Sequence, residues 1–220
     1  MINAYVIRIK DNEQSSRAAD RLILSMPPII KPTIFDAVVP DQVDRLMKKY
    51  KLKWTWPWEG QQFDFKSGLI MTAYPTAEPK KRIGCFLSHY MLWERCVKHD
   101  EHMIINEHDA LYFSNETLPI EKFEESRYNI IGLNTPIRAT RLASGYDRVV
   151  QESTNDIVRA PEIDNHNIPQ GIAGNSSYYI KPEGAQHMIN LTKEHGCWPN
   201  DALMCRQLVP KLGQTKHYYT

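Results

Sequence analysis

The sequence predicts an α/β fold in which a mixed, mainly parallel central sheet is flanked by helices within one domain, residues 1–220. Two observations predict it. Short runs of β-branched and aromatic residues alternate with amphipathic stretches from the first residues onward, which is typical of a βαβα opening. The chain has 220 residues, 42% of them hydrophobic, so it can bury a sizeable core without disulfide bonds.

The first two strands and helices follow directly from this alternation. Residues 4–9 form an apolar, β-branched run, and residues 17–24 are amphipathic. A second strand is predicted over residues 34–39. Asp41 is a suitable helix cap, which predicts a helix from there to Tyr50.

The middle of the chain contains the most apolar helix. Residues 51–82 show no steady period and carry three tryptophans, so we expect a long functional loop rather than a linker. Residues 83–99 are apolar around most of the helical circumference, which indicates a buried helix. Buried strands are predicted over residues 103–105 and 128–133.

The last third is less regular. Residues 134–170 are polar and predict irregular structure, whereas residues 177–180 resemble a strand. Pro182 is well placed to open a helix that continues to about His195. A final helix is predicted from about Asn200 to Val209.

The bulk charge excludes some classes of partner. The formal net charge is only +1, so no global field attracts nucleic acid or an anionic membrane. No segment matches a signal peptide or a membrane span, and we therefore expect a soluble protein without integral membrane association, in the cytoplasm of a bacterium or of a phage-infected host. Four cysteines without metal-binding spacing predict reduced thiols; Cys85 and Cys96 are roughly 16 Å apart on one helix and cannot bridge.

Two carboxylates follow the strand over residues 103–105. Glu107 and Asp109 are two residues apart, so in extended backbone both side chains face the same side. Ligands bind at the carboxyl edge of open α/β sheets, and carboxylate oxygens suit Mg²⁺ or Mn²⁺. Such a cation stabilises a leaving diphosphate. A solvated acidic turn is the alternative explanation of the pair.

Four short motifs resemble glycosyltransferase family 25, which includes lipooligosaccharide galactosyltransferases and collagen galactosyltransferases. They are I-G-C-F-L-S-H at residues 83–89 with Trp93 one turn on, the strand and aromatic segment of residues 104–113, G-N-S-S-Y-Y-I at residues 174–180 followed by Gly184-Ala185, and P-N-D at residues 199–201. The resemblance implies a GT-A fold, a divalent metal and a nucleotide-diphosphate sugar, with UDP favoured. It implies a hexosyl- or pentosyltransferase.

The resemblance also implies roles for the acidic motif. The family has E-D-D where this chain has Glu107-His108-Asp109, so the middle acid is replaced by histidine. Glu107 is expected to bind the donor ribose or the metal, and Asp109 the metal. His108 would point to the other side of the strand, as a core or surface histidine rather than a ligand.

One carboxylate is expected to act on the acceptor. A neutral hydroxyl is a poor nucleophile, so inverting transfer needs a base. The resemblance places Asp201 of the P-x-D element in this role. Asp201 also lies at a predicted helix start, where an acid can simply cap free amides.

Basic residues beside the first strand are candidates for binding the donor. Arg8, Lys10 and Arg17 follow or flank this strand, where a GT-A fold holds the base and phosphates, and their charges can neutralise a diphosphate. Solvated loop charges are the alternative. His217 is a candidate metal ligand because several GT-A enzymes use a histidine near the C-terminus.

The family-like blocks add four donor-binding candidates. Ser88 and His89 are adjacent on a helix and point about 100° apart, so they cannot form a hydrolase dyad. Contact with the donor, or helix packing, explains them better. Gly174 and Asn175, which open the third block, are also assigned to the donor.

The sequence leaves two classes of acceptor open, a glycan and DNA. Trp54, Trp56 and Trp58 lie among lysines, a combination that can stack on sugar rings, stack on nucleic-acid bases, or form core beneath a lysine-covered surface. The resemblance makes a glycan such as lipooligosaccharide the first expectation. A phage-type enzyme that glycosylates hydroxymethylated pyrimidines in DNA, on a base flipped out of the stack, is the second hypothesis. A non-catalytic sugar- or nucleotide-binding module is the third. Residues 1–110 are expected to bind the donor and residues 111–220 the acceptor.

Overall fold

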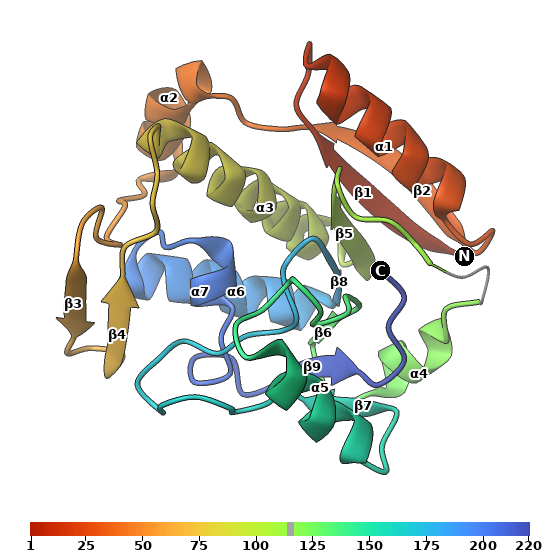
Figure 1. The fold of residues 1–220 in the computed structure, drawn as a ribbon. Helices are drawn as coiled ribbons and strands as arrows, with labels where there is room; N and C mark the ends of the chain where they lie inside the picture. Colours follow the sequence, from red (N-terminus) through yellow and green to blue (C-terminus); the bar gives the residue numbers. More distant parts are fainter. Residues whose placement is uncertain (114–116) are drawn as a thin grey trace.

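The computed structural model describes residues 1–113 and 117–220 and contains a seven-stranded sheet in the order β2-β1-β5-β8-β6-β9-β7 (Figure 1). Strands β1, β2, β5, β6 and β9 run in one direction, while β7 and β8 run the opposite way. The predicted α/β class with a mixed, mainly parallel sheet is confirmed.

The first half of the sheet forms in the order that the alternation predicts, although the second strand spans residues 30–36 rather than the predicted 34–39. β1 (Ile2–Arg8), α1 (Glu13–Ser25), β2 (Ile30–Asp36) and α2 (Pro40–Tyr50) follow one another, and β1 pairs in parallel with β2. Asn12 caps α1 by accepting a hydrogen bond from the backbone of Ser15 at 2.8 Å.

The long apolar helix leads into the central strand. α3 (Pro79–His99) begins with proline, which is favoured at the first helical position because its missing N–H would have no partner there. β5 (Met103–Glu107) pairs in parallel with β1 on the side opposite β2. The long helix starts four residues before its predicted start at residue 83.

Two segments predicted to be irregular contain regular structure. The loop over residues 51–82 includes a hairpin of β3 (Gln61–Asp64) and β4 (Leu69–Thr72), which projects from the body at one end of the molecule (Figure 1). Within the segment 134–170 lie α5 (Ala143–Glu152) and β7 (Ile157–Arg159). β3 and β7 have only four and three residues, and β3 is largely solvent-exposed, so neither strand leaves a clear apolar pattern in the sequence.

The rest of the chain completes the sheet. α4, β6, β8, α6, α7 and β9 span Ile120–Glu125, Ile130–Gly132, Ser177–Ile180, Pro182–His195, Asn200–Leu203 and Leu212–Thr215. The prediction that the last helix continues to Val209 is wrong, because α7 has only four residues. β9 was not predicted, since its Leu-Gly-Gln-Thr sequence is not apolar although all four residues are buried.

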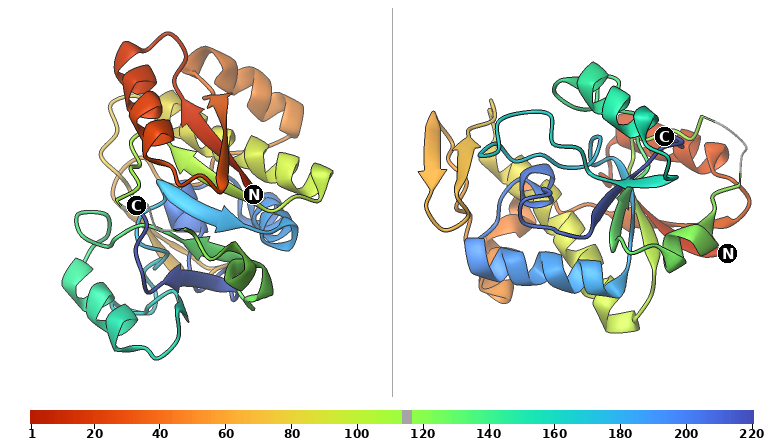
Figure 2. Two further views of the ribbon diagram at one scale, coloured as in Figure 1. Left: turned by 90° about the vertical axis from the view of Figure 1, so that its right-hand side faces the viewer. Right: turned by 90° about the horizontal axis from the view of Figure 1, so that it is seen from below.

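Helices cover both faces of the sheet (Figure 2). Alternate residues of β1 separate the two apolar layers: Tyr5 and Ile7 pack in the layer that includes residues of α2, α3 and α6, whereas Ala4 and Val6 pack in the layer that includes residues of α1 and α4. All four cysteines are free thiols. Among the described residues, none of the helices has the length and apolar character that a membrane crossing requires.

Close packing fixes α3 against the segment that follows β2. A Cβ atom added at Gly84 would lie 2.4 Å from the carbonyl oxygen of Val38, which is backbone and cannot move aside easily. One turn on, the Ser88 hydroxyl accepts a hydrogen bond from the Val38 amide at 2.9 Å and donates to the Gly84 carbonyl at 2.8 Å. The helix therefore has little freedom to shift along this contact.

Replacement of Gly84 by alanine is expected to destabilise the fold by about 1–3 kcal/mol, because the methyl group overpacks the contact with Val38. The matched control is Gly145→Ala in α5, where an added Cβ meets nothing within 4 Å. That change should be neutral or raise the free energy of unfolding by up to about 1 kcal/mol. Urea denaturation measures both, and equal effects would contradict this reading of the packing.

Candidate functional site

The sheet has a topological switch point between β1 and β5. From β1 the chain crosses through α1 to β2 on one side, and later returns through α3 to β5 on the other side. Connections that diverge in this way open a crevice beyond the carboxyl ends of the two strands, where open α/β sheets bind ligands. Ile7 pairs with Glu107 and Arg8 with Asp36 in the strand register. Arg8 and Glu107 are therefore brought to the same edge.

Glu107 is the last residue of β5 and is held by α3. Its Oε1 lies 3.1 Å from Nε2 of the buried His89 and 4.0 Å from Sγ of Cys85, while its side chain remains 29% exposed. Its backbone amide donates to the Ser176 carbonyl at 2.7 Å. One carboxylate oxygen is thus fixed by the protein, and the group still faces the crevice.

A buried chain of hydrogen bonds orients His89. Trp93 Nε1 donates to the Tyr178 hydroxyl at 2.9 Å, and this hydroxyl lies 2.9 Å from His89 Nδ1. A carboxylate oxygen can only accept, so the neutral imidazole carries its hydrogen on Nε2 toward Glu107, and Nδ1 accepts from the Tyr178 hydroxyl. His89 then donates from Nε2 to Glu107. Every member of the chain is satisfied.

Asp201, in the first turn of α7, lies close enough to Glu107 for the two charges to interact. Its Oδ1 accepts from the Ala202 amide at 3.0 Å, and its Oδ2 lies 3.5 Å from the Tyr74 hydroxyl. Surrounding protein raises the pKa of Asp201 by desolvation, Arg82 opposes this rise and Glu107 adds to it. The carboxyl group is nevertheless accessible from a cavity.

The same charges surround the Cys85 thiol. Burial is the largest cause that raises the pKa of Cys85, and Glu107, Asp201 and Asp109 raise it further, whereas Arg82 lowers it. These acids and the arginine, although distant in sequence, therefore belong to one electrostatic environment. The raised pKa favours the protonated thiol, which can act as a weak hydrogen-bond donor to neighbouring oxygens.

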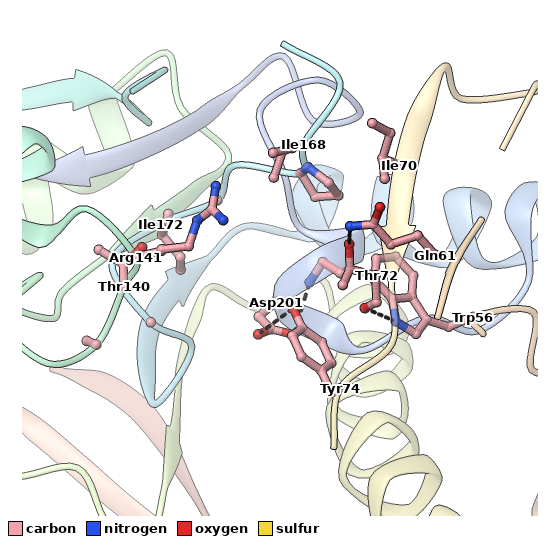
Figure 3. Close-up of a pocket in the computed structure, with 15 residues that line it drawn as sticks. Trp56, Gln61, Ile70, Thr72, Tyr74, Thr140, Arg141, Ile168, Ile172 and Asp201 are labelled. Atoms are coloured by element: carbon pink, nitrogen blue, oxygen red, sulfur yellow. Dashed lines mark hydrogen bonds between the residues drawn. The ribbon is translucent and has the colours of Figure 1, made fainter. Parts of the chain in front are cut away.

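A cavity of about 500 Å³ opens above Asp201 (Figure 3). Trp56 and Tyr74 line one side, with ring centroids 6.0 Å apart and planes inclined by 16°. Arg141 lies on the opposite side and forms an ion pair with Asp164. The cavity combines flat aromatic surface, a guanidinium group and a carboxylate, a set of groups suited to a polar ring compound.

Comparison with known proteins identifies the family. The family described as glycosyltransferase family 25 (LPS biosynthesis protein) matches residues 1–204. The chain belongs to glycosyltransferase family 25. Its activity class is therefore glycosyl transfer, and the predicted family and enzyme class are confirmed.

No curated protein matches this sequence. A solved structure of mouse xyloside xylosyltransferase 1 in its apo form is similar with a TM-score of 0.43 and 12% identity, covering 96% of this chain and 70% of that chain.

In this family 25 glycosyltransferase the three basic candidates lie in different environments. Arg8 donates to Asp36 at 2.6 Å at the crevice edge, and its buried Nε has no partner among the described residues. Lys10 is exposed in the turn after β1. Arg17 is 76% exposed and pairs with Glu13 on the solvent side of α1. Arg8 is therefore the best placed of the three to face a donor.

The other candidate residues also differ in their burial and in their location. Asp109 is exposed in the turn that follows β5, beside the half-buried His108. Ser88 is fully buried, and both of its hydrogen bonds go to backbone. His217 lies away from this group, in a hollow lined by residues of α4 and β7. Where the structure describes the chain, the metal-ligating side chains that come together are Cys85, His89 and Glu107.

The tryptophans divide into a stacked pair and a cavity residue. Trp54 and Trp58 stack on each other with centroids 4.9 Å apart. Trp56 is buried, donates from Nε1 to the Thr72 carbonyl at 3.0 Å and lines the cavity. Gly174 also lines the cavity in a left-handed conformation, φ +67°, and the amide group of its neighbour Asn175 is buried without a partner.

Four residues of the site escaped prediction: Tyr74, Cys85, Arg82 and Arg141. Cys85 stands within a recognised motif but shows no spacing typical of a ligand. Tyr74 precedes α3 and Arg82 lies in its first turn, both within residues 51–82, which show no steady period. The contact between the Arg82 guanidinium and the Tyr74 ring at 5.0 Å depends on the fold. Arg141 lies in a polar loop, where a single arginine carries no signal.

Replacement of Tyr178 by phenylalanine should lower the free energy of unfolding by about 1–3 kcal/mol, because it leaves Trp93 Nε1 and His89 Nδ1 buried without partners. The matched control is Tyr179→Phe. The Tyr179 hydroxyl bonds His102, which is only half buried and can turn to water. Chemical denaturation should show the larger loss for Tyr178→Phe, and the reverse order would contradict the proposed network.

Proposed function

We propose that this chain transfers a sugar from a nucleotide-diphosphate sugar, a UDP-sugar, to a hydroxyl group of a glycan acceptor. One observation carries the proposal: the Cys85 thiol lies 4.0 Å from Glu107 at the end of β5 and 3.9 Å from Asn200, the residue that directly precedes Asp201 in the aromatic cavity. A donor in the crevice and an acceptor in the cavity would therefore meet between these two carboxylates.

Glu107 and Asp109 are the residues proposed to hold a divalent cation, Mn²⁺ or Mg²⁺. The Cys85, His89 and Glu107 cluster does not fit a metal, because both imidazole nitrogens of His89 already have hydrogen-bond partners. Carboxylate oxygens fit a hard cation. Glu107 has a second oxygen beyond the one that His89 fixes, and Asp109 is exposed. The cation would supply charge stabilisation for the leaving diphosphate.

The donor is proposed to occupy the crevice formed by residues 1–110. Arg8 lies at its edge and can pair with a phosphate through a guanidinium group that Asp36 already orients. His89 acts as a positioning residue that fixes the direction of the Glu107 carboxylate. Asn175 has buried amide atoms that need partners, which suits contact with donor hydroxyls.

Asp201 is proposed as the general base. The acceptor hydroxyl gives its proton to the Asp201 carboxylate while its oxygen bonds to the anomeric carbon, and the bond from that carbon to the diphosphate breaks. A raised pKa makes Asp201 a stronger base than an ordinary aspartate. Residues 111–220 supply this base and one wall of the cavity, and the β3–β4 hairpin completes the other wall.

The acceptor is proposed to be a glycan of the lipooligosaccharide type. Tyr74 and the largely buried Trp56 stack on each other in the cavity wall, and the apolar faces of sugars stack on aromatic surface of this kind. Trp54 and Trp58 also stack on each other but lie outside the set of residues that lines this cavity. Hydroxymethylated DNA remains the alternative acceptor, and a binding module without turnover remains the alternative class.

A metal-dependent screen for release of free nucleoside diphosphate tests the function. The wild type is expected to release UDP only with Mn²⁺ or Mg²⁺ and a glycan acceptor. Asp109→Asn should lose at least about 100-fold in kcat/KM without a change in stability, because it removes a charged ligand at an exposed position.

The matched control for Asp109→Asn is Asp20→Asn on the exposed side of α1, which should retain full activity. Release stimulated by hydroxymethylated DNA and by no glycan would replace the proposed acceptor. Binding of a UDP-sugar with Mn²⁺ but no release or hydrolysis under any condition would identify a non-catalytic module.

The pH profile tests Asp201. Because the base must be deprotonated, kcat/KM should fall as the pH drops through the raised pKa of Asp201, at a midpoint above the ordinary value of 3.8. Arg82 lowers this pKa, so Arg82→Gln should move the midpoint to higher pH. Asp201→Asn should lose about 100-fold or more in rate and the acid limb with it. An acid limb that stays in place in Arg82→Gln would assign the base to another group.

A further inference from the structure

Asn200 occupies the space between the two carboxylates of the site. It is the first residue of α7, directly precedes Asp201, and is only 7% exposed. Its Oδ1 lies 3.9 Å from Sγ of Cys85, whose thiol also reaches Glu107 at 4.0 Å. Asn200 is therefore linked through Cys85 to the carboxylate on the donor side and through the chain to the one on the acceptor side.

One half of the Asn200 side chain has no partner. The Nδ2 amide is buried and makes no hydrogen bond within the described residues. Buried amide groups in folded proteins almost always have partners, and an unpaired one at a functional site is commonly explained by a ligand or water that occupies the site. Because Oδ1 is the atom of the amide group that lies beside the Cys85 thiol, at 3.9 Å, the amide nitrogen is directed away from the thiol.

Resting on the proposed function, we propose that Asn200 Nδ2 donates a hydrogen bond to a hydroxyl oxygen of the sugar that is transferred. The sugar must lie between the group that holds the diphosphate and the base that activates the acceptor, and Asn200 adjoins Asp201 in the chain and contacts Cys85, whose thiol lies 4.0 Å from Glu107. Most carbons of a sugar ring carry a hydroxyl group, whose oxygen can accept such a bond.

This contact makes Asn200 a specificity-determining residue for the donor. A site that donates to a substrate hydroxyl discriminates strongly against the analogue without it, because the buried amide is then left unpaired. The nucleotide part does not take part in this contact. The residue should therefore distinguish sugars attached to the same nucleoside diphosphate, without changing the affinity for the nucleoside diphosphate itself.

The experiment compares a parent nucleotide sugar with its monodeoxy analogues. For the wild type, kcat/KM should be at least about 100-fold lower for one monodeoxy donor than for the parent. Asn200→Ala should reduce this selectivity to within about 5-fold, chiefly by slowing the parent donor. The matched control, Asn190→Ala, removes the same amide group from an exposed position of α6 and should keep the wild-type selectivity.

Calorimetry separates failure of this inference from failure of the proposed function. Asn200→Ala should weaken binding of the nucleotide sugar at least about 10-fold and leave binding of the free nucleoside diphosphate unchanged. A wild type that binds nucleotide sugars but never transfers them overturns the proposed function. In that case, weaker binding of the nucleotide sugar alone by Asn200→Ala still supports the contact between Asn200 and the sugar.

Three results would overturn the inference itself. In the first, the active wild type uses every monodeoxy donor as well as the parent, an outcome that needs no folded variant. In the second, Asn200→Ala slows the parent and all deoxy donors by the same factor. In the third, the variant weakens the nucleoside diphosphate and the nucleotide sugar equally.

Discussion

The buried hydrogen-bond chain from Trp93 through Tyr178 and His89 to Glu107 is the constraint on which the site depends. It joins α3 to β8 and β5, and so connects a helix to two adjacent strands of the sheet. Each hydrogen bond of the chain fixes the donor and acceptor roles in the neighbouring bond. The Glu107 oxygen at the end of the chain is therefore held in one orientation. The carboxylate at the crevice is therefore oriented by residues that a ligand does not need to touch.

Three acids near Cys85 are opposed by Arg82, which leaves the described site negatively charged. Arg82 also lies over the ring of Tyr74, which bonds Asp201, so its position depends on the acceptor-side cavity. Neighbouring carboxylates repel one another unless a bound cation or a bound proton neutralises part of their charge. Binding of a cation on the donor side would consequently alter the basicity of the carboxylate on the acceptor side.

The sequence predicts the half of the fold in which periodicity and burial agree. The β1–α1–β2–α2 unit, α3 and β5 follow from apolar spacing. The expected extended backbone through Asp109 is wrong, because β5 ends at Glu107 and Asp109 lies in the next turn, so strand alternation does not set its direction. β9 and the β3–β4 hairpin escape because four-residue strands with glycine, glutamine or exposed side chains carry no distinctive period. Contacts between distant segments, such as Tyr74 with Asp201 or Cys85 with Asn200, depend on tertiary packing alone.

The β3–β4 hairpin is attached to the body through alternate residues of one strand. Leu69 and Met71 of β4 are buried in the core, whereas β3 is largely exposed. Asn167 adds backbone contacts to Gly68 and Ile70. Gln61 of β3 and Thr72 of β4 line the cavity instead of the core. Cavity-facing positions of this hairpin can therefore change over evolution while Leu69 and Met71 keep it in place, which would let related enzymes diverge in what they glycosylate without a change in the sheet.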